Sequence, residues 1–575
     1  MMGELTVWAP LAGRVEAVIG DERLPLQPAD GGWWTLHRDV PPGTDYAFSL
    51  DGSEPLPDPR SPWQPHGING PSRTVDHAAF DWTDTAWRAP PLGSGMVYEL
   101  HIGTFTPGGT FDSAIERLPE LASLGVTHVE LMPVAEFSGD HGWGYDGVDL
   151  YAPHHAYGEP DALKRMVNAA HGLGLAVIMD VVYNHLGPTG NYLPRFGPYF
   201  TDRYITPWGS AVNYDDRGAE EVRRFVVDNA LMWLRDYHAD GLRLDAVHAI
   251  FDNSALHILE QMAREVGRLG LELGRPLLVT AESDQNDPRL VRSTDAGGHG
   301  LDAAWNDDFH HALHAVLTGE RTGYYADFGE MSHLADTLEQ AWVYRGDFSS
   351  ERERRHGREP LGVPGDRFIG FIQNHDQIGN RARGRRIAHL AGMGRAKIAA
   401  AVVFTAPFVP LIFQGEEWAA STPFLYFADH RDPELADSVR TGRRDEFVRF
   451  GWDPAHIPDP QAPDTFERSR LPWDERRQGE HADMLEWHRA LIALRQATPA
   501  LLDPRLSQVS CRYDADAGWF VIDRGGIGIA FNLAANPVQL ELAGTLLLGS
   551  STGVHLDQGA LTLPPDSVAI LELGE

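Results

Sequence analysis

Four short segments of this chain place charged or imidazole side chains directly after, or at the end of, an apolar run. They are Asp180–His185 (DVVYNH), Gly241–Ile250 (GLRLDAVHAI), Thr280–Ser283 (TAES) and Phe371–Asp376 (FIQNHD). The catalytic groups of a (β/α)8 barrel come from the C-terminal ends of different strands, so residues far apart in sequence meet in one cleft. The groups that would meet here are mostly carboxylic acids, which suits nucleophilic and acid–base chemistry.

The second segment pairs an acid with a base. Strand side chains alternate between two faces, which places Leu242 and Leu244 on one face and Arg243 and Asp245 on the other. An opposite charge nearby favours the ionised carboxylate and lowers its pKa. Asp245 is therefore predicted to stay charged and to act as a nucleophile or charge stabiliser.

Glu282 has a different setting in the sequence. It follows the mostly apolar run Leu277–Ala281, with no basic neighbour in sequence. Burial raises the pKa of a carboxyl group, which suits an acid that must hold a proton near neutral pH. One charged and one protonated acid are what glycoside hydrolysis requires, and retaining enzymes place the two about 5 Å apart. Asp376, beside His375, supplies a third acid.

A structural interpretation competes at each acid. A single Asp or Glu at a strand end is more often a helix cap, a turn residue or a surface ion pair. Four such segments in this order favour a functional site instead. Isolated histidines such as His128 and His171 are interpreted as structural.

In residue type, order and strand position, the four segments resemble the four signature regions of glycoside hydrolase family 13. This is the α-amylase family of retaining enzymes, which act on α-glucosidic bonds. The resemblance implies that Asp245 is the nucleophile, Glu282 the general acid/base and Asp376 the transition-state stabiliser. Sugar contacts in the −1 subsite are implied for Tyr145, His185, Arg243 and His375.

The resemblance also bears on metal binding. Asp180 matches a supporting acid, and Asn184 matches a metal ligand of the calcium-containing members of the family. Those members carry an inserted domain where this chain has only the short segment 186–218. The calcium ligand set is therefore incomplete, and we expect no required metal and no other cofactor.

Further segments resemble particular members of the family, namely Glu99–Thr106, Leu244–Ile250, Ala281–Asp284, Asn374–Asn380 and Phe424–His430. Those members hydrolyse the α-1,4 bond next to the terminal trehalose of maltooligosyltrehalose and release trehalose and a maltooligosaccharide. His248 and Gln377 would then contact trehalose in the +1 and +2 subsites. The implied partners are maltooligosyltrehalose and related α-glucans, with a maltooligosyltrehalose synthase as a functional partner.

Two alternatives stay open at this point. A glycogen-branching enzyme shares all four regions but transfers α-1,4 chains to make α-1,6 bonds. A non-catalytic glucan-binding scaffold would keep the barrel alone. The three intact acids, Asp245, Glu282 and Asp376, argue against the scaffold.

Composition narrows the class of protein further. The net charge of −34 argues against partners that are nucleic acids or anionic membranes, whereas a neutral sugar fits. Cys511 is the only cysteine, so an intrachain disulfide is excluded. We find no signal peptide pattern and no run near the roughly 18 apolar residues of a membrane span. A cytoplasmic enzyme is expected.

The elements that must position the site follow from hydrophobic periodicity. Residues 1–90 show short alternating runs typical of a β-sandwich, which resembles carbohydrate-binding modules in isoamylases and branching enzymes. Residues 91–498 alternate strand and helix patterns, which predicts an α/β fold with a central (β/α)8 TIM barrel. Residues 499–575 return to short strands, which predicts a C-terminal β-sandwich. The predicted barrel strands are Met96–His101, Val129–Met132, Ala176–Val182, Leu242–Asp245, Leu277–Ala281, Leu301–Trp305, Phe368–Gln373 and Phe408–Phe413.

Overall fold

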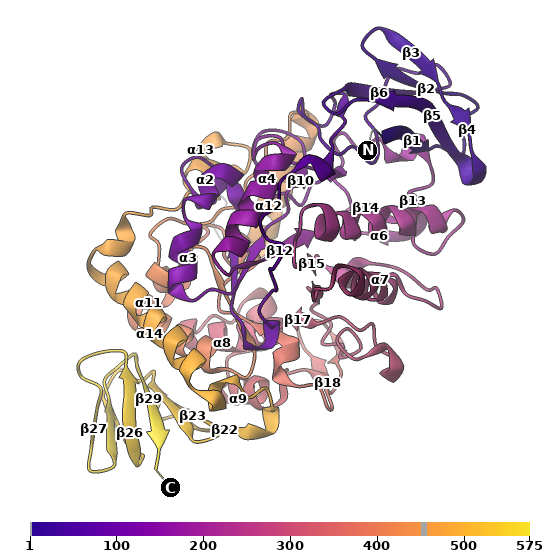
Figure 1. Ribbon diagram of the computed structural model, residues 1–575. Helices are drawn as coiled ribbons and strands as arrows, with labels where there is room; N and C mark the ends of the chain where they lie inside the picture. Colours follow the sequence, from indigo (N-terminus) through magenta and orange to yellow (C-terminus); the bar gives the residue numbers. More distant parts are fainter. Residues whose placement is uncertain (1–2, 450–456, 575) are drawn as a thin grey trace.

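A closed barrel of parallel strands forms the centre of the molecule (Figure 1). The computed structural model describes residues 3–449 and 457–574. The barrel closes because β21 pairs with β8. Each strand overlaps one predicted from the sequence, which confirms the (β/α)8 fold. In chain order the strands are β8 (Val97–Leu100), β9 (His128–Leu131), β12 (Ala176–Val181), β15 (Gly241–Leu244), β16 (Leu278–Ala281), β17 (Ala303–Trp305), β20 (Phe368–Gly370) and β21 (Val409–Phe413).

The helices between these strands cover the outside of the barrel. Strands covered on both sides are buried on both faces, and here almost every strand residue is buried. The principal helices are α4 (Pro160–Gly172), α6 (Ala219–Asp236), α7 (Ile258–Leu273), α8 (Asp307–Thr318), α11 (Ile387–Thr405) and α14 (Gly479–Ala497).

Two local differences from the sequence pattern have clear causes. Apolar residues from Phe111 to Leu124 recur at the spacing of one helix, but the chain forms two, α2 (Phe111–Ile115) and α3 (Leu118–Leu124). Pro119 lacks an N–H donor and can occupy only the first turn of a helix, so a new helix starts there. Strand β20 stops at Gly370, earlier than predicted, and the chain continues as a loop to Asn374, whose side chain caps the next helix.

β-sheets flank the barrel at both ends of the chain and lie on opposite sides of it in Figure 1. The flanking sheets confirm the predicted fold class, while the boundaries at residues 90/91 and 498/499 stay predictions. The N-terminal sheets contain β1 (Gly3–Trp8), β5 (Trp33–Val40) and β4 (Gln27–Pro28), and β3 (Glu22–Pro25), β2 (Val15–Ile19), β6 (Asp45–Leu50) and β7 (Ser72–Arg73). The C-terminal sheets contain β22 (Val509–Asp514), β23 (Trp519–Arg524), β24 (Ile527–Asn532), β29 (Ser567–Leu573) and β26 (Gly544–Gly549), and β25 (Val538–Glu541), β28 (Ala560–Leu563) and β27 (His555–Asp557).

The insertion at 186–218 has regular secondary structure. It folds into the short helix α5 (Leu193–Phe196) and a hairpin of β13 (Phe200–Thr206) and β14 (Gly209–Val212).

Of the helices in the described ranges, α11 alone has the length and apolar composition of a membrane span. Its C-terminal half is buried in the protein, so α11 is a core helix of the barrel wall.

A buried hydrogen-bond network ties the segment before the barrel to the barrel itself. Asp84 Oδ2 lies 2.8 Å from Nδ1 of both His171 and His238. Asp240 continues the network, 2.9 Å from His171 Nε2, and accepts a hydrogen bond from Trp87 Nε1 at 2.8 Å. Side chains that are buried and charged are costly unless each has a partner, so this network should stabilise the fold.

We expect Asp84→Asn to lower the free energy of unfolding by about 2–3 kcal/mol, because the carboxylate is buried and serves two imidazoles. Burial alone would raise the pKa of Asp84, but the hydrogen bonds from the histidines lower it overall. Its contribution is therefore present above the unfolded pKa of about 3.9 and is lost as the pH falls below it.

Urea unfolding at pH 7 and below pH 4 measures this effect. Asp81→Asn, a change at an exposed acid nearby, is the matched control and should leave the midpoint unchanged. Equal midpoints for Asp84→Asn and the wild type at pH 7 would contradict the assigned role.

Candidate active site

A cleft of about 720 Å³ contains most of the side chains predicted to do chemistry. Its lining draws on residues from the ends of several barrel strands and from the later part of the chain. The predicted residues among this lining are Tyr145, His185, Asp245, His248, Glu282, His375 and Asp376. The remaining two, Arg243 and Gln377, are not part of the lining.

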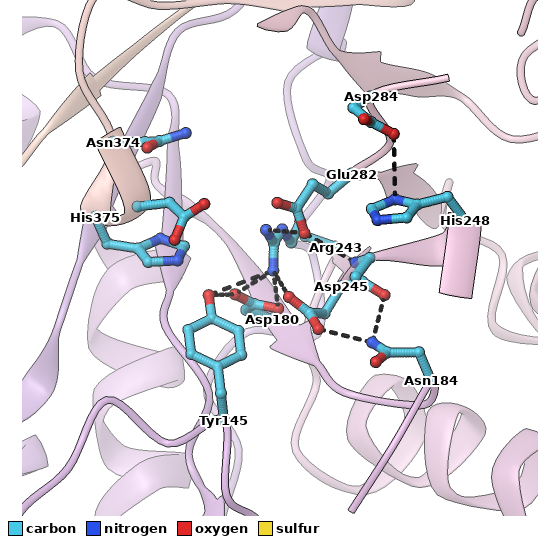
Figure 2. Close-up of polar contacts among 12 residues, drawn as sticks. Tyr145, Asp180, Asn184, Arg243, Asp245, His248, Glu282, Asp284, Asn374 and His375 are labelled. Atoms are coloured by element: carbon cyan, nitrogen blue, oxygen red, sulfur yellow. Dashed lines mark hydrogen bonds and ion pairs between the residues drawn. The ribbon is translucent and has the colours of Figure 1, made fainter. Parts of the chain in front are cut away.

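Arg243 lies buried at the centre of the acidic group (Figure 2). Its Nη1 donates to both carboxylate oxygens of Asp180 at 2.8 Å and to Asp245 Oδ1 at 3.0 Å. Arg243, on β15, and Asp245, directly after it, therefore point to the same side, as the strand alternation predicted. Arg243 Nη2 also lies 2.9 Å from Glu282 Oε2, a basic neighbour that the local sequence of Glu282 did not indicate.

Asp245 is held by donors on both oxygens. Asn184 Nδ2 donates to Asp245 Oδ2 at 2.7 Å and to its backbone oxygen at 2.8 Å, while Arg243 holds Oδ1. The carboxylate is therefore oriented and charge-paired while it still lines the cleft. These are the conditions that a carboxylate nucleophile needs.

The residue after Asp245 links the two principal acids. Ala246 adopts a left-handed backbone conformation with φ 38°, which is uncommon for a residue with a Cβ atom. In this conformation its N–H donates to Glu282 Oε2 at 2.8 Å. The backbone next to Asp245 thus fixes one oxygen of Glu282.

Glu282 has a raised pKa, as its apolar approach predicted. Burial is the largest cause, and the charge of Asp245 adds to it, while Arg243 opposes both. A nearby like charge and burial both disfavour ionisation of a carboxyl group. Glu282 can therefore hold a proton nearer neutral pH than an ordinary glutamate.

Asp376 lies in the first turn of α10 (His375–Gly379). Burial raises its pKa and the neighbouring His375 lowers it, and Asn380 Nδ2 donates to its Oδ1. Burial alone would lower the pKa of His375, but its contact with the Glu99 carboxylate raises it overall. Glu99, on β8, had no local signal that connected it to this site.

Tyr145 lines the cleft and is held from beneath by the buried Asp180. Tyr145 OH donates to Asp180 Oδ2 at 2.6 Å, and its ring stacks on His375 with centroids 5.1 Å apart. Burial raises the pKa of Asp180 to about 7, against the lowering effect of Arg243. An exposed aromatic face beside these groups is suited to a sugar ring.

Several lining residues were missed by sequence reasoning. Trp208, in the loop between β13 and β14, stacks on His185 with centroids 4.1 Å apart. Tyr426 and Arg443 line another side of the cleft. Phe424 does not reach the cleft, because it is buried and stacks on Trp143. The only feature of the sequence that indicated a role for Trp208 was that it is an aromatic residue within the 186–218 insertion.

His248 and Gln377, the two residues predicted to contact trehalose in the +1 and +2 subsites, differ in position. His248 lines the cleft, with Nδ1 3.9 Å from Asp284 Oδ1, and Arg352 Nη2 donates to Asp284 Oδ2 at 3.0 Å. Gln377 lies on α10, where Asn374 Oδ1 accepts a hydrogen bond from its backbone N–H. A role for Gln377 in trehalose binding stays a prediction.

Two sets of side chains in the described residues bear on metal binding. The Asn184 amide, which matched a calcium ligand, donates to Asp245, and its Oδ1 lies 2.5 Å from His185 Nδ1. Three other possible ligands, from Glu136, His154 and His155, lie within 4.8 Å of one another. They are outside the cleft lining. Glu136 already accepts a hydrogen bond from the backbone N–H of His155 at 2.7 Å.

Comparison with known proteins assigns the chain to a family. The model "Alpha amylase, catalytic domain" matches residues 74–196, and "Domain of unknown function (DUF3459)" matches residues 504–570. A malto-oligosyltrehalose trehalohydrolase from Rhizobium sp. (strain M-11) is 48% identical over 99% of this chain and 97% of its own length. The chain belongs to the malto-oligosyltrehalose trehalohydrolase family. It is a glycosidase, which removes the non-catalytic scaffold as an interpretation.

Two further comparisons refine this assignment. A solved structure from Salmonella typhimurium, described as an alpha amylase, is 40% identical and superposes with a TM-score of 0.91 over 99% of this chain and 97% of that one. A 1,4-alpha-glucan branching enzyme from Vibrio cholerae is 39% identical, but over only 39% of this chain and 34% of its own length. Likeness to the trehalohydrolase family extends along the whole chain, whereas this likeness to a branching enzyme does not.

Proposed function

We propose that this chain hydrolyses the α-1,4-glucosidic bond next to the terminal trehalose unit of maltooligosyltrehalose. The products are trehalose and a maltooligosaccharide with retained anomeric configuration. The observation that carries the proposal is the joint placement of Asp245 and Glu282 beside Arg243, with Ala246 N–H fixing Glu282. One of these acids is charge-paired and the other has a raised pKa, which is the division of roles that the reaction needs.

The first chemical step breaks the glycosidic bond. Asp245 attacks the anomeric carbon of the −1 glucose, while Glu282 donates its proton to the glycosidic oxygen. The bond between that carbon and oxygen breaks, trehalose leaves, and a covalent glycosyl-enzyme remains on Asp245. Arg243 Nη1 donates a hydrogen bond to Asp245 Oδ1 and orients it for the attack.

The second step releases the maltooligosaccharide. Glu282, now deprotonated, takes a proton from a water molecule, and the oxygen of that water attacks the same anomeric carbon. The bond to Asp245 breaks, so two inversions give net retention. In this proposal Asp376 and His375 hold hydroxyl groups of the −1 sugar, and the ring of Tyr145 lies beneath it.

The +1 and +2 subsites, on the leaving-group side of the bond that breaks, are proposed to hold trehalose. His248 and Asp284 lie on the opposite side of Glu282 from Tyr145 and His375 (Figure 2). If the −1 sugar rests on Tyr145, the leaving group therefore faces His248 and Asp284. Arg352 orients Asp284 by a hydrogen bond of 3.0 Å, which provides polar partners for disaccharide hydroxyl groups.

Product analysis tests the proposal directly. The purified protein is incubated with maltotriosyltrehalose and, separately, with maltopentaose and amylose. We expect free trehalose from the first substrate and much slower cleavage of the others. New α-1,6 branches on amylose without release of trehalose would overturn the proposal in favour of a branching enzyme. Pairing with a maltooligosyltrehalose synthase and a cytoplasmic location stay predictions.

A further inference from the structure

Helix α12 (Pro433–Arg449) forms one wall of the cleft. Val439, Gly442 and Arg443 line the cleft, yet none of residues 433–445 is buried. Among these residues, polar contacts link the helix to the rest of the protein. On one side Arg440 Nε pairs with Asp459 Oδ2 at 2.9 Å.

Arg443 makes the contacts that face the active site. Its Nη2 donates to Asn380 Oδ1 at 2.9 Å and to the backbone oxygen of Gly379 at 3.2 Å. Its guanidinium carbon lies 4.3 Å from the centre of the Tyr426 ring. A planar guanidinium that both stacks and donates is held in one orientation.

The contact with Asn380 determines which way its amide points. Arginine can only donate, so the atom of Asn380 that faces Arg443 must be the oxygen. The amide nitrogen is then turned to Asp376, and Nδ2 donates to Asp376 Oδ1. A rotated amide would place its oxygen against the carboxylate, which is repulsive and leaves both acceptors without a donor.

We propose that Arg443 is a positioning residue that fixes the Asn380 amide, and through it the carboxylate of Asp376. Helix α12 thereby completes the active site. The inference rests on the proposed function, because the role of Asp376 comes from there. Helix α12, which lies outside the four signature segments, would then contribute to catalysis through Arg443.

A double-mutant cycle tests the proposal. Arg443→Met removes the donors and the charge at similar length, and Asn380→Leu removes the amide. Each should lower kcat on maltotriosyltrehalose by about tenfold or more, with KM changed by less than about threefold. In the double variant the second change should add less than about threefold. Arg443→Lys, which keeps a donor and the charge, should restore most of the loss.

Arg440→Met is the matched control. Arg440 also holds α12, through Asp459, but does not contact Asn380. Its kcat should stay within about threefold of the wild-type value. A loss equal to that of Arg443→Met, or additive effects in the cycle, would overturn the positioning role. Unchanged thermal unfolding confirms that each variant is folded.

The pH profile supplies a readout that a purely structural role would not move. The titratable and charged groups that interact with Asp376 include His375, Glu282, Arg243 and Arg443, together with Asp307 and Tyr324. Burial raises the pKa of Asp376 and Arg443 lowers it, so loss of the arginine charge should raise it further. The acid limb of kcat/KM should move to higher pH in Arg443→Met and stay in place in Arg443→Lys; an unmoved limb in Arg443→Met would count against the proposal.

Failure of this inference can be told apart from failure of the proposed function. If the wild type cleaves maltopentaose but releases no trehalose from maltotriosyltrehalose, the proposed function is wrong. The same cycle is then measured on maltopentaose. Coupling between Arg443 and Asn380 on that substrate would support the positioning role, and additivity would overturn it.

Discussion

Asp245→Asn should lower the release of trehalose from maltotriosyltrehalose by about 10⁴-fold or more, because an amide cannot form the glycosyl-enzyme. The barrel should stay folded. Arg243 keeps two other carboxylate partners, Asp180 and Glu282, so the change does not leave a buried charge without a partner. Initial rates and thermal unfolding of the same preparation measure both effects.

A chemical rescue identifies the role of Asp245 more sharply. Asp245→Gly leaves space for azide on the face from which the carboxylate would attack. With an α-maltosyl fluoride substrate, we expect azide to give the β-glycosyl azide, because only one inversion occurs. An α-azide product, or wild-type-like hydrolysis by Asp245→Asn, would remove the nucleophile assignment.

Glu282→Gln should lower kcat/KM on maltotriosyltrehalose by about 10³-fold, because the leaving oxygen loses its proton donor. With a maltosyl fluoride substrate, the rate of the first step should fall much less in this variant, because fluoride leaves without protonation. Azide should then give the α-glycosyl azide from the accumulated glycosyl-enzyme. Loss of activity on both substrates to the same extent would contradict the acid/base role.

The pH dependence gives an independent check on Glu282. Its pKa is raised, chiefly by burial, and it must be protonated for the first step. The wild-type kcat/KM should therefore fall on the alkaline side as Glu282 loses its proton, at a pH above the usual range of a glutamate. Glu282→Gln should lack this alkaline limb in its residual activity on maltotriosyltrehalose, where the leaving oxygen needs the proton. Glu265→Gln, at a surface acid of α7, is the control that should keep it.

Much of the fold was predictable because its signals are local. Each barrel strand is a short apolar run, and each of the runs predicted as a barrel strand forms one, in the predicted order along the chain. The acids that end these runs were predictable for the same reason. Parallel strands all present their C-terminal ends at one side of a barrel, so Asp245 and Glu282 had to approach one another.

Local sequence patterns therefore predicted the barrel, the convergence of the principal acids and the common side of Arg243 and Asp245. They did not predict that Arg243 pairs with Glu282, that Trp208 reaches the cleft or that Arg443 donates to Asn380. The two sets of features differ in the range of the interactions involved. Strand alternation and apolar runs act over a few residues, whereas these contacts join separate elements. Their geometry depends on how those elements pack, which no local pattern encodes.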